Sequence, residues 1–208
     1  GIAASDGATL HVEKAMGWVA DVFSPERLKR LPGRSAMGHV RYSTAGSSTL
    51  RNAQPITATF SRGSIALGHN GNLVNAEALR KELEALGAIF QSTSDSEVIL
   101  HLIARADRQT LERTLTQAIS QLSGAYSLVM LTPDTLVGCR DPHGFRPLVI
   151  GRLGKTWLLA SETCALDMIG AKYVRDIDPG EIVVFDDQGA HSHKPFPPIP
   201  PRPCIFEY

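Results

Sequence analysis

The chain has 208 residues, with 21 Lys plus Arg against 21 Asp plus Glu, so its formal net charge is zero. A neutral chain lacks the electrostatic attraction typical of nucleic-acid and anionic-membrane partners, and no run of about 18 apolar residues predicts a membrane-spanning helix. Three scattered cysteines, Cys139, Cys164 and Cys204, fit neither a disulfide framework nor a CxxC metal site. Residues 1–20 show no signal peptide, so we expect a cytoplasmic protein.

Two strands are predicted in the N-terminal third. The alternation in 35–44 places His39 and Arg41 on one face of a strand, and the strand at 63–71 carries His69 near its end. Both strands arrive at a Gly-His pair followed by polar residues. We therefore expect the ends of these two strands to lie side by side.

Three helices are predicted next, at 75–87, 92–106 and 110–122, from apolar residues recurring every three or four positions. Ser94 and Glu97 have the spacing of a capping box at the start of the second helix. Each helix is therefore expected to bury one apolar stripe.

Strand patterns return after the helices, as YSLVMLT, LVGCRD, PLVIGRL, TWLLASE and EIVVFDD, with turn signals between them. Runs of strands, then helices, then strands predict an α+β fold with helices packed on largely antiparallel sheet. The last segment, 195–208, holds six prolines between Pro195 and Pro203 and favours an extended polyproline conformation. It is predicted to be a strap or an exit linker.

Four polar groups at the ends of regular elements predict a site for an α-amino acid. Arg41 can clamp a carboxylate, and Asp95 can accept hydrogen bonds from an ammonium group. The side-chain amide of Asn70 and the backbone N–H of Gly71 together can form an oxyanion hole. Taken singly, an arginine is more often a surface or structural ion-pair partner, an aspartate more often a helix cap, and an Asn-Gly pair more often a turn.

Three motifs carry a resemblance to a known family. HVRYSTAG (39–46), HNGNLVN (69–75) and SDSEV (94–98) resemble, in that order, the glutamine-binding motifs of class II glutamine amidotransferases, which are N-terminal-nucleophile hydrolases. The resemblance implies a four-layer αββα sandwich, here truncated at its N-terminus and missing its first strand.

The resemblance also implies roles for individual residues, with L-glutamine as the ligand. Arg41 and the neighbouring backbone at Thr44 would hold the α-carboxylate of glutamine, and Asp95 its α-ammonium group. Asn70 and Gly71 would form the oxyanion hole. In the family an N-terminal cysteine attacks the glutamine side chain, a γ-glutamyl thioester forms, ammonia leaves and water releases glutamate.

A second set of segments, DPHGFRPLVIG, ASETCALD, RDIDPGEIVVF and PCIFEY, resembles the branch of the family that transfers the ammonia to phosphoribosyl pyrophosphate in purine synthesis. We therefore expect residues 1–194 to be a partial glutaminase domain and residues 195–208 to lead toward a phosphoribosyltransferase domain. Magnesium is expected in that second domain, and a homo-oligomer when the protein is full length. The catalytic cysteine of the family precedes GIAASDG, so this chain alone is expected to be inactive.

Several other features have plainer interpretations. Cys204 matches a position that serves as an iron–sulfur ligand in some members of the family, which leaves the presence of a cluster open. Cys139 is expected to be a small core residue, and His191 with His193 to lie in a polar loop rather than a metal site. Arg146 is expected to fix a turn, with a role in lining the site as the alternative. Asp186 and Asp187 are interpreted as a turn after a strand.

Two other functions are left open. One is the glutaminase domain of another class II amidotransferase, which would deliver ammonia to a sugar phosphate or to aspartate. The other is a non-enzymatic interaction module, because residues 197–202 fit the PxxPxR pattern of SH3 ligands.

Overall fold

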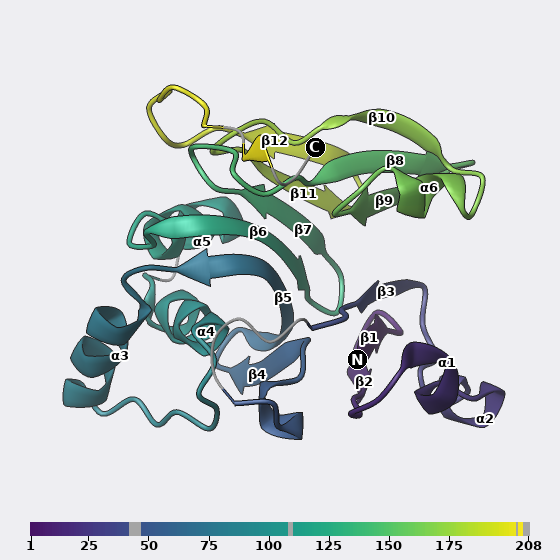
Figure 1. Ribbon diagram of the computed structural model, residues 1–208, viewed down its shortest axis with the longest axis horizontal. Coiled ribbons are helices and arrows are strands. Elements are labelled where there is room, and N and C mark those ends of the chain that lie inside the picture. Colours follow the sequence, from purple (N-terminus) through teal and green to yellow (C-terminus); the bar gives the residue numbers. More distant parts are fainter. Residues whose placement is uncertain (42–46, 108–109, 203, 206–208) are drawn as a thin grey trace.

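The computed structural model describes the whole chain except residues 42–46, 108–109, 203 and 206–208. The described part forms stacked layers around a central six-stranded sheet, as Figure 1 shows. Three helices cover one face of this sheet, and two three-stranded sheets cover the other. A short helix packs outside one of the small sheets, which completes the four-layer α+β sandwich implied by the family resemblance.

The six-stranded sheet is antiparallel throughout and has the order β12-β11-β7-β6-β5-β4. Its strands are β4 (Ile56–Phe60), β5 (Gly63–Leu73), β6 (Gly124–Leu131), β7 (Leu136–Arg140), β11 (Ile182–Asp186) and β12 (Gly189–His193). β5 is 11 residues long and continues past the end of its neighbour β4, whose first residue, Ile56, is paired with Leu67. The last part of β5 therefore has a free edge.

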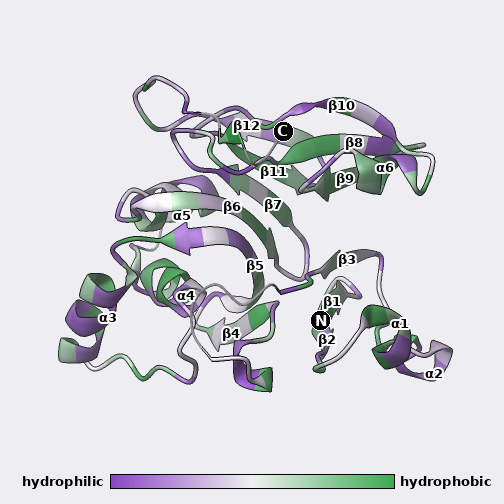
Figure 2. Ribbon diagram, in the orientation of Figure 1, coloured by the Kyte–Doolittle hydropathy of each residue, from purple (hydrophilic) through white to green (hydrophobic). Residues whose placement is uncertain are grey.

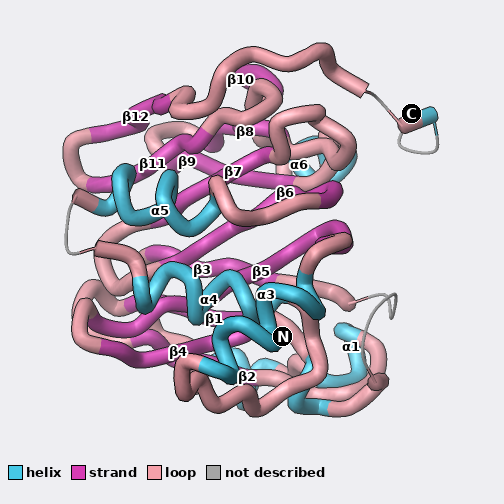
Figure 3. Tube along the Cα trace, turned by 90° about the vertical axis from the view of Figure 1, so that its left-hand side faces the viewer, coloured by secondary structure: helices cyan, strands magenta, loops and turns pink. Residues whose placement is uncertain are grey.

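Three helices, α3 (Ala76–Ala85), α4 (Ser96–Arg105) and α5 (Leu111–Ile119), lie against the same face of this sheet, as the side view in Figure 3 shows. Their apolar stripes meet the sheet in the largest core cluster, which includes Leu79, Ile99, Leu115, Leu67 and Leu128. In Figure 2 strands β7 and β8 are mostly in the hydrophobic colour, whereas α3 alternates between hydrophilic and hydrophobic residues. Burial of these stripes is the main stabilisation of the helices, because helices of nine or ten residues are marginal in water.

The opposite face of the large sheet carries two small antiparallel sheets. One has the order β2-β1-β3, and the other has the order β10-β8-β9. Their strands are β1 (Ile2–Ser5), β2 (Leu10–Glu13), β3 (Ser35–Gly38), β8 (Val149–Leu153), β9 (Thr156–Ala160) and β10 (Lys172–Asp176). The short helices are α1 (Val19–Val22), α2 (Pro25–Leu28), η1 (Leu50–Asn52) and α6 (Cys164–Asp167).

Among the described residues, no helix is long and apolar enough to cross a membrane.

The structure confirms the three predicted helices and corrects the start of the second. Ser94 and Glu97 do not form a capping box, because the Glu97 carboxylate instead accepts the N–H groups of Gln91 and Ser92, at 2.8 and 2.7 Å. The helix begins at Ser96, and the Ser94 hydroxyl accepts the Ser96 N–H at 3.3 Å. Glu97 therefore organises the loop that leads into α4.

Two strand expectations also change. The strand predicted at 35–44 ends at Gly38, and its residues 42–44 lie outside the described part of the chain. His191 and His193 were expected in a loop, but they belong to β12, an edge strand paired with β11. The ends of β3 and β5 do lie side by side as expected, since the His39 ring nitrogen Nε2 is 3.2 Å from the carbonyl oxygen of His69.

The proline-rich segment returns to the domain surface. Phe196 packs against the main core, and the Arg202 N–H donates to the carbonyl of His143 at 2.9 Å. The described part of this segment is therefore anchored at two points.

Candidate active site

Four of the residues singled out by the sequence line one cavity of about 450 Å³. Asn70 and Gly71 lie on the free edge of β5, Asp95 precedes α4, and Arg41 follows β3. The structure therefore brings these four groups together. Thr44, the fifth residue of the predicted site, lies outside the described residues.

The free edge of β5 shows which backbone group points into the cavity. The His69 N–H donates to Oε1 of Gln54 at 2.6 Å, and the Leu73 N–H donates to Oδ2 of Asp95 at 3.0 Å. Both groups leave β5 on the side away from β6. Because backbone groups alternate along a strand, the N–H of Gly71, midway between them, is directed to the same side. This is the direction that an oxyanion donor at this cavity requires.

Gly71 has a backbone conformation that only glycine adopts readily. Its φ is 149°, and a Cβ atom at this position would clash with the carbonyl oxygen of Ala125 on β6. The missing side chain leaves the N–H of Gly71 open to a ligand. The structure adds a second reason, which is the close approach of the two strands.

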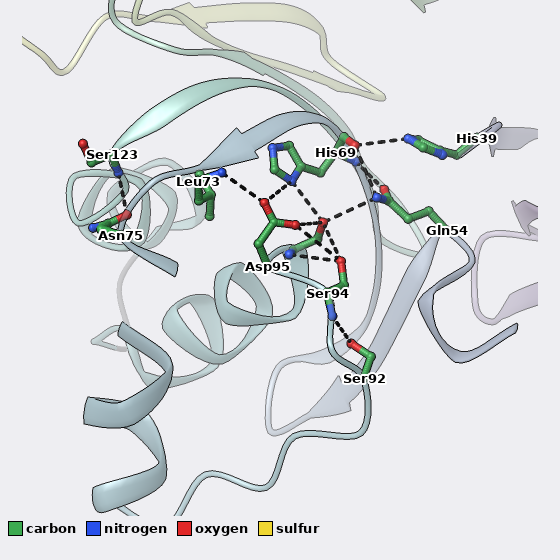
Figure 4. A network of polar contacts seen from close by, with 10 residues as sticks. His39, Gln54, His69, Leu73, Asn75, Ser92, Ser94, Asp95 and Ser123 are labelled. Atoms are coloured by element: carbon green, nitrogen blue, oxygen red, sulfur yellow. Dashed lines mark hydrogen bonds and ion pairs between the residues drawn. The ribbon is translucent and has the colours of Figure 1, made fainter. Parts of the chain in front are cut away.

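Asp95 is fixed by its neighbours rather than by capping its own helix. It occupies the N-cap position of α4 without a capping hydrogen bond. Figure 4 shows the contact of its Oδ2 with the Leu73 N–H, and its Oδ1 accepts the Ser96 hydroxyl at 3.3 Å. Its side chain is 12% exposed, and an ionised carboxylate offers about four acceptor sites. Acceptor capacity therefore remains for a cationic group in the cavity.

Two histidines that line the cavity are neutral, because burial lowers the pKa of each. Burial lowers the pKa of His39 to about 4, and burial also lowers the pKa of His69, against the opposing effect of the nearby Asp95 carboxylate. A neutral His39 carries its proton on Nε2, because this nitrogen faces the carbonyl oxygen of His69. Nδ1 of His69 is 3.0 Å from the hydroxyl of Ser96. The floor of the cavity is thus a hydrogen-bonded network without a charged imidazole.

The wall across the cavity is formed by the loop after β7. Asp141 is fully buried, and its carboxylate accepts the N–H of Phe145 at 3.0 Å. Arg140 donates from Nε to the carbonyl of Arg146 at 2.7 Å. These contacts fix the main chain at Arg146, which is one of the residues that line the cavity, as is Glu162. Arg146 thus belongs both to the turn and to the wall.

The sequence missed the polar residues that support the site. They are Gln54, His69, Ser94 and Ser96, all buried, and Glu162 on the cavity wall. For His69 a signal was present, since a polar side chain on an apolar strand face predicts a buried hydrogen-bond network. For Gln54 the sequence held no such signal, because its role depends on where a strand begins.

No cysteine is found among the described residues that line the cavity. Cys139 is fully buried in β7, as expected, and burial raises the pKa of its thiol. Cys164 is exposed on α6, and Cys204 is half-buried in the C-terminal segment. An iron–sulfur cluster needs about four thiolates, and the described residues contain no group of three His, Cys, Asp or Glu that could hold a metal ion. The described residues alone therefore do not fit a cluster.

Comparison with known proteins shows which family the chain resembles. The profile of the glutamine amidotransferase domain family matches residues 39–168, which include all four cavity residues predicted from the sequence and described in the structure. The chain is 48% identical over 208 residues to amidophosphoribosyltransferase 2, chloroplastic, of Arabidopsis thaliana, covering 100% of this chain and 37% of that protein. It is 43% identical over 209 residues to the amidophosphoribosyltransferase of Bacillus subtilis, covering 100% of this chain and 44% of that protein.

The fold is also similar to a solved structure, the glutamine phosphoribosylpyrophosphate amidotransferase of Bacillus subtilis complexed with ADP and GMP. The TM-score is 0.93 with 40% sequence identity, over 99% of this chain and 45% of the other. The chain thus spans less than half the length of these relatives. Because the family profile matches more than half of the residues, the chain belongs to the glutamine amidotransferase domain family.

Proposed function

We propose that this chain is the glutamine-hydrolysing portion of an amidophosphoribosyltransferase. It would release ammonia from L-glutamine for transfer to phosphoribosyl pyrophosphate, which yields 5-phosphoribosylamine in purine nucleotide synthesis. The observation that carries the proposal is the single cavity shared by a guanidinium group, a carboxylate and a backbone N–H directed inward. The identity of 43% to amidophosphoribosyltransferase of Bacillus subtilis supports the choice of acceptor.

In this proposal each charged end of glutamine has one partner. The Arg41 guanidinium, with the backbone near Thr44, holds the α-carboxylate, and the Asp95 carboxylate holds the α-ammonium group. The side-chain carbonyl of glutamine then lies at Asn70 and Gly71. The side-chain amide of Asn70 and the N–H of Gly71 stabilise the oxygen when it becomes negative.

The chemistry follows from this placement. A cysteine thiolate, supplied in the complete enzyme by a segment before Gly1, attacks the side-chain carbonyl carbon, and the carbonyl electrons move to the oxygen. The α-amino group of that cysteine, which has taken the proton of the thiol, gives this proton to the departing nitrogen, so the tetrahedral intermediate collapses to a thioester with loss of ammonia. Water then cleaves the thioester and releases glutamate. The Gly1 nitrogen is 2.9 Å from the carbonyl oxygen of His39, so a segment joined there would start beside the cavity.

The remaining expectations concern the complete enzyme and stay predictions. They are phosphoribosyl pyrophosphate as the acceptor, magnesium in a second domain, a homo-oligomer and a cytoplasmic location. The relative from Arabidopsis thaliana is named as a chloroplastic protein, so tagging of the complete protein in cells is the test of location.

Titration calorimetry with this chain tests the ligand. We expect L-glutamine to bind, whereas the methyl ester, which lacks the α-carboxylate, and N-acetyl-L-glutamine, which lacks the α-ammonium group, should each bind at least about tenfold more weakly. Arg41→Met should remove the preference for the free carboxylate. Arg51→Met, an exposed arginine in η1, is the matched control and should leave binding unchanged.

Two results would contradict the proposal. Equal affinity for glutamine and both blocked derivatives would show that the charged groups of the cavity do not recognise an α-amino acid. If the complete enzyme hydrolyses glutamine but does not aminate phosphoribosyl pyrophosphate, the proposed glutaminase activity is retained and the proposed acceptor is wrong.

A further inference from the structure

The hydrogen-bonded ladder between β4 and β5 stops just before the cavity. Its last pair is Ile56 with Leu67. The residue before Ile56 is Pro55, which has no backbone N–H and so does not extend a ladder as a donor. His69 is the next residue of β5 whose backbone N–H and C=O point toward the side of β4. Without β4 beside it, these two backbone groups would have no strand partner.

The side chain of Gln54 takes the place of the missing strand. Its Oε1 accepts the His69 N–H at 2.6 Å, and its Nε2 donates to the His69 carbonyl at 3.3 Å, as Figure 4 shows. One side-chain amide thus satisfies both backbone groups of one residue, as a paired strand residue would. Gln54 is only 5% exposed, and its Nε2 also lies 3.4 Å from the hydroxyl of Ser96. His39 adds a second donor to the same carbonyl, at 3.2 Å.

This contact bears directly on the oxyanion donors. The carbonyl of His69 belongs to the peptide unit that leads into Asn70, and a peptide unit is planar. Holding this carbonyl therefore fixes the start of Asn70 and limits the orientation of the next N–H, that of Gly71. On the other side, Asp95 holds the Leu73 N–H. Gly71, which has no side chain to anchor it, lies between two fixed points.

We propose that Gln54 is a positioning residue for the oxyanion hole. It acts through the backbone of His69 and sets the direction of the Gly71 N–H and the place of the Asn70 amide. The inference rests on the proposed glutaminase function and extends it to a residue outside the glutamine-binding groups. Displacement of a hydrogen-bond donor by about 1 Å can lower the rate about a hundredfold. Substitution of Gln54 should therefore lower kcat and leave KM nearly unchanged.

Two variants of the complete enzyme separate the two hydrogen bonds. Gln54→Met has nearly the same shape and can make neither bond. Gln54→Glu can still accept the His69 N–H but, when ionised, has no proton to donate to the carbonyl. We expect kcat for glutamine hydrolysis to fall at least about tenfold in Gln54→Met and less in Gln54→Glu, with KM changed less than about threefold in both.

Asn75, which lies two residues after the last residue of β5, provides a matched control. Its side chain also bridges two backbone groups, accepting the Ser123 N–H at 3.0 Å and donating to the Gln121 carbonyl at 2.8 Å, but it does not line the cavity. Asn75→Ala should lower the melting temperature and leave kcat and KM unchanged. If kcat falls equally in the Asn75 and Gln54 variants, the effect is a general loss of structure and the inference is wrong.

A spectroscopic readout covers the case in which Gln54→Met folds poorly. In ¹H–¹⁵N spectra of this chain, L-glutamine should shift the Gly71 amide signal, and Gln54→Glu should change both this signal and its response. An unchanged Gly71 signal and an unchanged kcat in Gln54→Glu would overturn the inference. Failure of the unsubstituted enzyme to bind or hydrolyse glutamine would instead overturn the proposed function, so the two failures are distinguishable.

Discussion

The carboxylate of Asp95 combines contacts within the chain with a proposed contact to the ligand. It accepts the backbone N–H of Leu73, which is neutral, and in the proposed function it also accepts the ammonium group of glutamine, which is charged. The first contact stabilises the structure, and the second, in the proposed function, recognises the ligand. A substitution that separates charge from shape can therefore distinguish them.

Asp95→Asn should affect glutamine binding without loosening the strand. The asparagine carbonyl can still accept the Leu73 N–H, but the attraction between opposite charges is lost. A hydrogen bond to a charged group contributes about 1.5–3 kcal/mol, so KM should rise roughly tenfold to a hundredfold while the melting temperature stays close to that of the unsubstituted enzyme. Steady-state glutaminase kinetics with thermal melting measure both. An unchanged KM would mean that Asp95 does not hold the α-ammonium group.

His39 makes the stability of the chain depend on pH. Burial lowers its pKa to about 4 from the ordinary value of 6.5, so in this window the unfolded chain binds more protons than the folded one. Stability should therefore fall as the pH is lowered from about 6.5 to about 4. The expected loss is about 1–3 kcal/mol, less than the full shift would give because the side chain is partly exposed.

The variant His39→Gln tests this pH effect. Glutamine can still donate to the His69 carbonyl but does not titrate. Free energies of unfolding in urea, measured from about pH 7 to about pH 4, should show a shallower pH dependence in this variant. Parallel curves for the two proteins would show that another group is responsible.

At the scale of elements, the sequence predicted what depends on local periodicity. The stripes of α3, α4 and α5 repeat every three or four residues, and the apolar runs of β6, β7 and β11 are bounded by turn signals. β12 could not be predicted in this way, because Gly-Ala-His-Ser-His has no apolar alternation. It becomes a strand through pairing with β11, which is a long-range contact.

The residues of the candidate site also differ in whether local sequence could predict them. Arg41, Asp95 and the Asn70–Gly71 pair could be predicted because they are polar groups at the ends of regular elements. Gln54 could not, because its task arises only when β4 begins two residues later and leaves His69 without a partner. Support of this kind depends on register, which a single strand pattern does not reveal.

Arg62 joins three elements from the turn between β4 and β5. It donates to the hydroxyl of Thr114 in α5 and to the carbonyls of Ile103 and Ala106 at the end of α4, at 2.6, 3.0 and 2.6 Å. A cation at a helix C-terminus satisfies carbonyls that have no partner within the helix. Arg62→Ala should lower the free energy of unfolding by about 1–3 kcal/mol in urea. Arg105→Ala, for which the described residues show no comparable contacts, is the control and should change it by less than about 0.5 kcal/mol.

At the scale of the whole molecule, the large sheet is shared by separate cores. The core under β8 and β9 and the core under β1 and β3 both pack against Val129 and Leu136 of the central sheet. Loss of one small sheet would therefore expose apolar surface that the other also uses. We expect the described layers to unfold as one cooperative unit.

The two tryptophans allow this expectation to be tested. Trp157 on β9 packs against Phe185 of the central sheet, with ring centroids 5.6 Å apart, whereas Trp18 is 82% exposed. In Trp18→Phe the fluorescence reports on Trp157 alone. Its unfolding midpoint in urea should coincide with that of the far-ultraviolet circular dichroism. An earlier fluorescence transition would show that the sheet containing β9 separates before the helices melt.

The bond between Asp95 and Leu73 has a consequence for ligand size. Asp95 precedes α4, yet its carboxylate is held to β5, and the N–H of Gly71 leaves the same strand two residues earlier, about 7 Å away in an extended chain. The spacing between these two groups is therefore set by the covalent repeat of the backbone. A site with this fixed spacing should discriminate between ligands by the length of their side chains more strongly than by their volume. An amino acid amide shorter or longer by one methylene group would reach only one of the two contacts at a time.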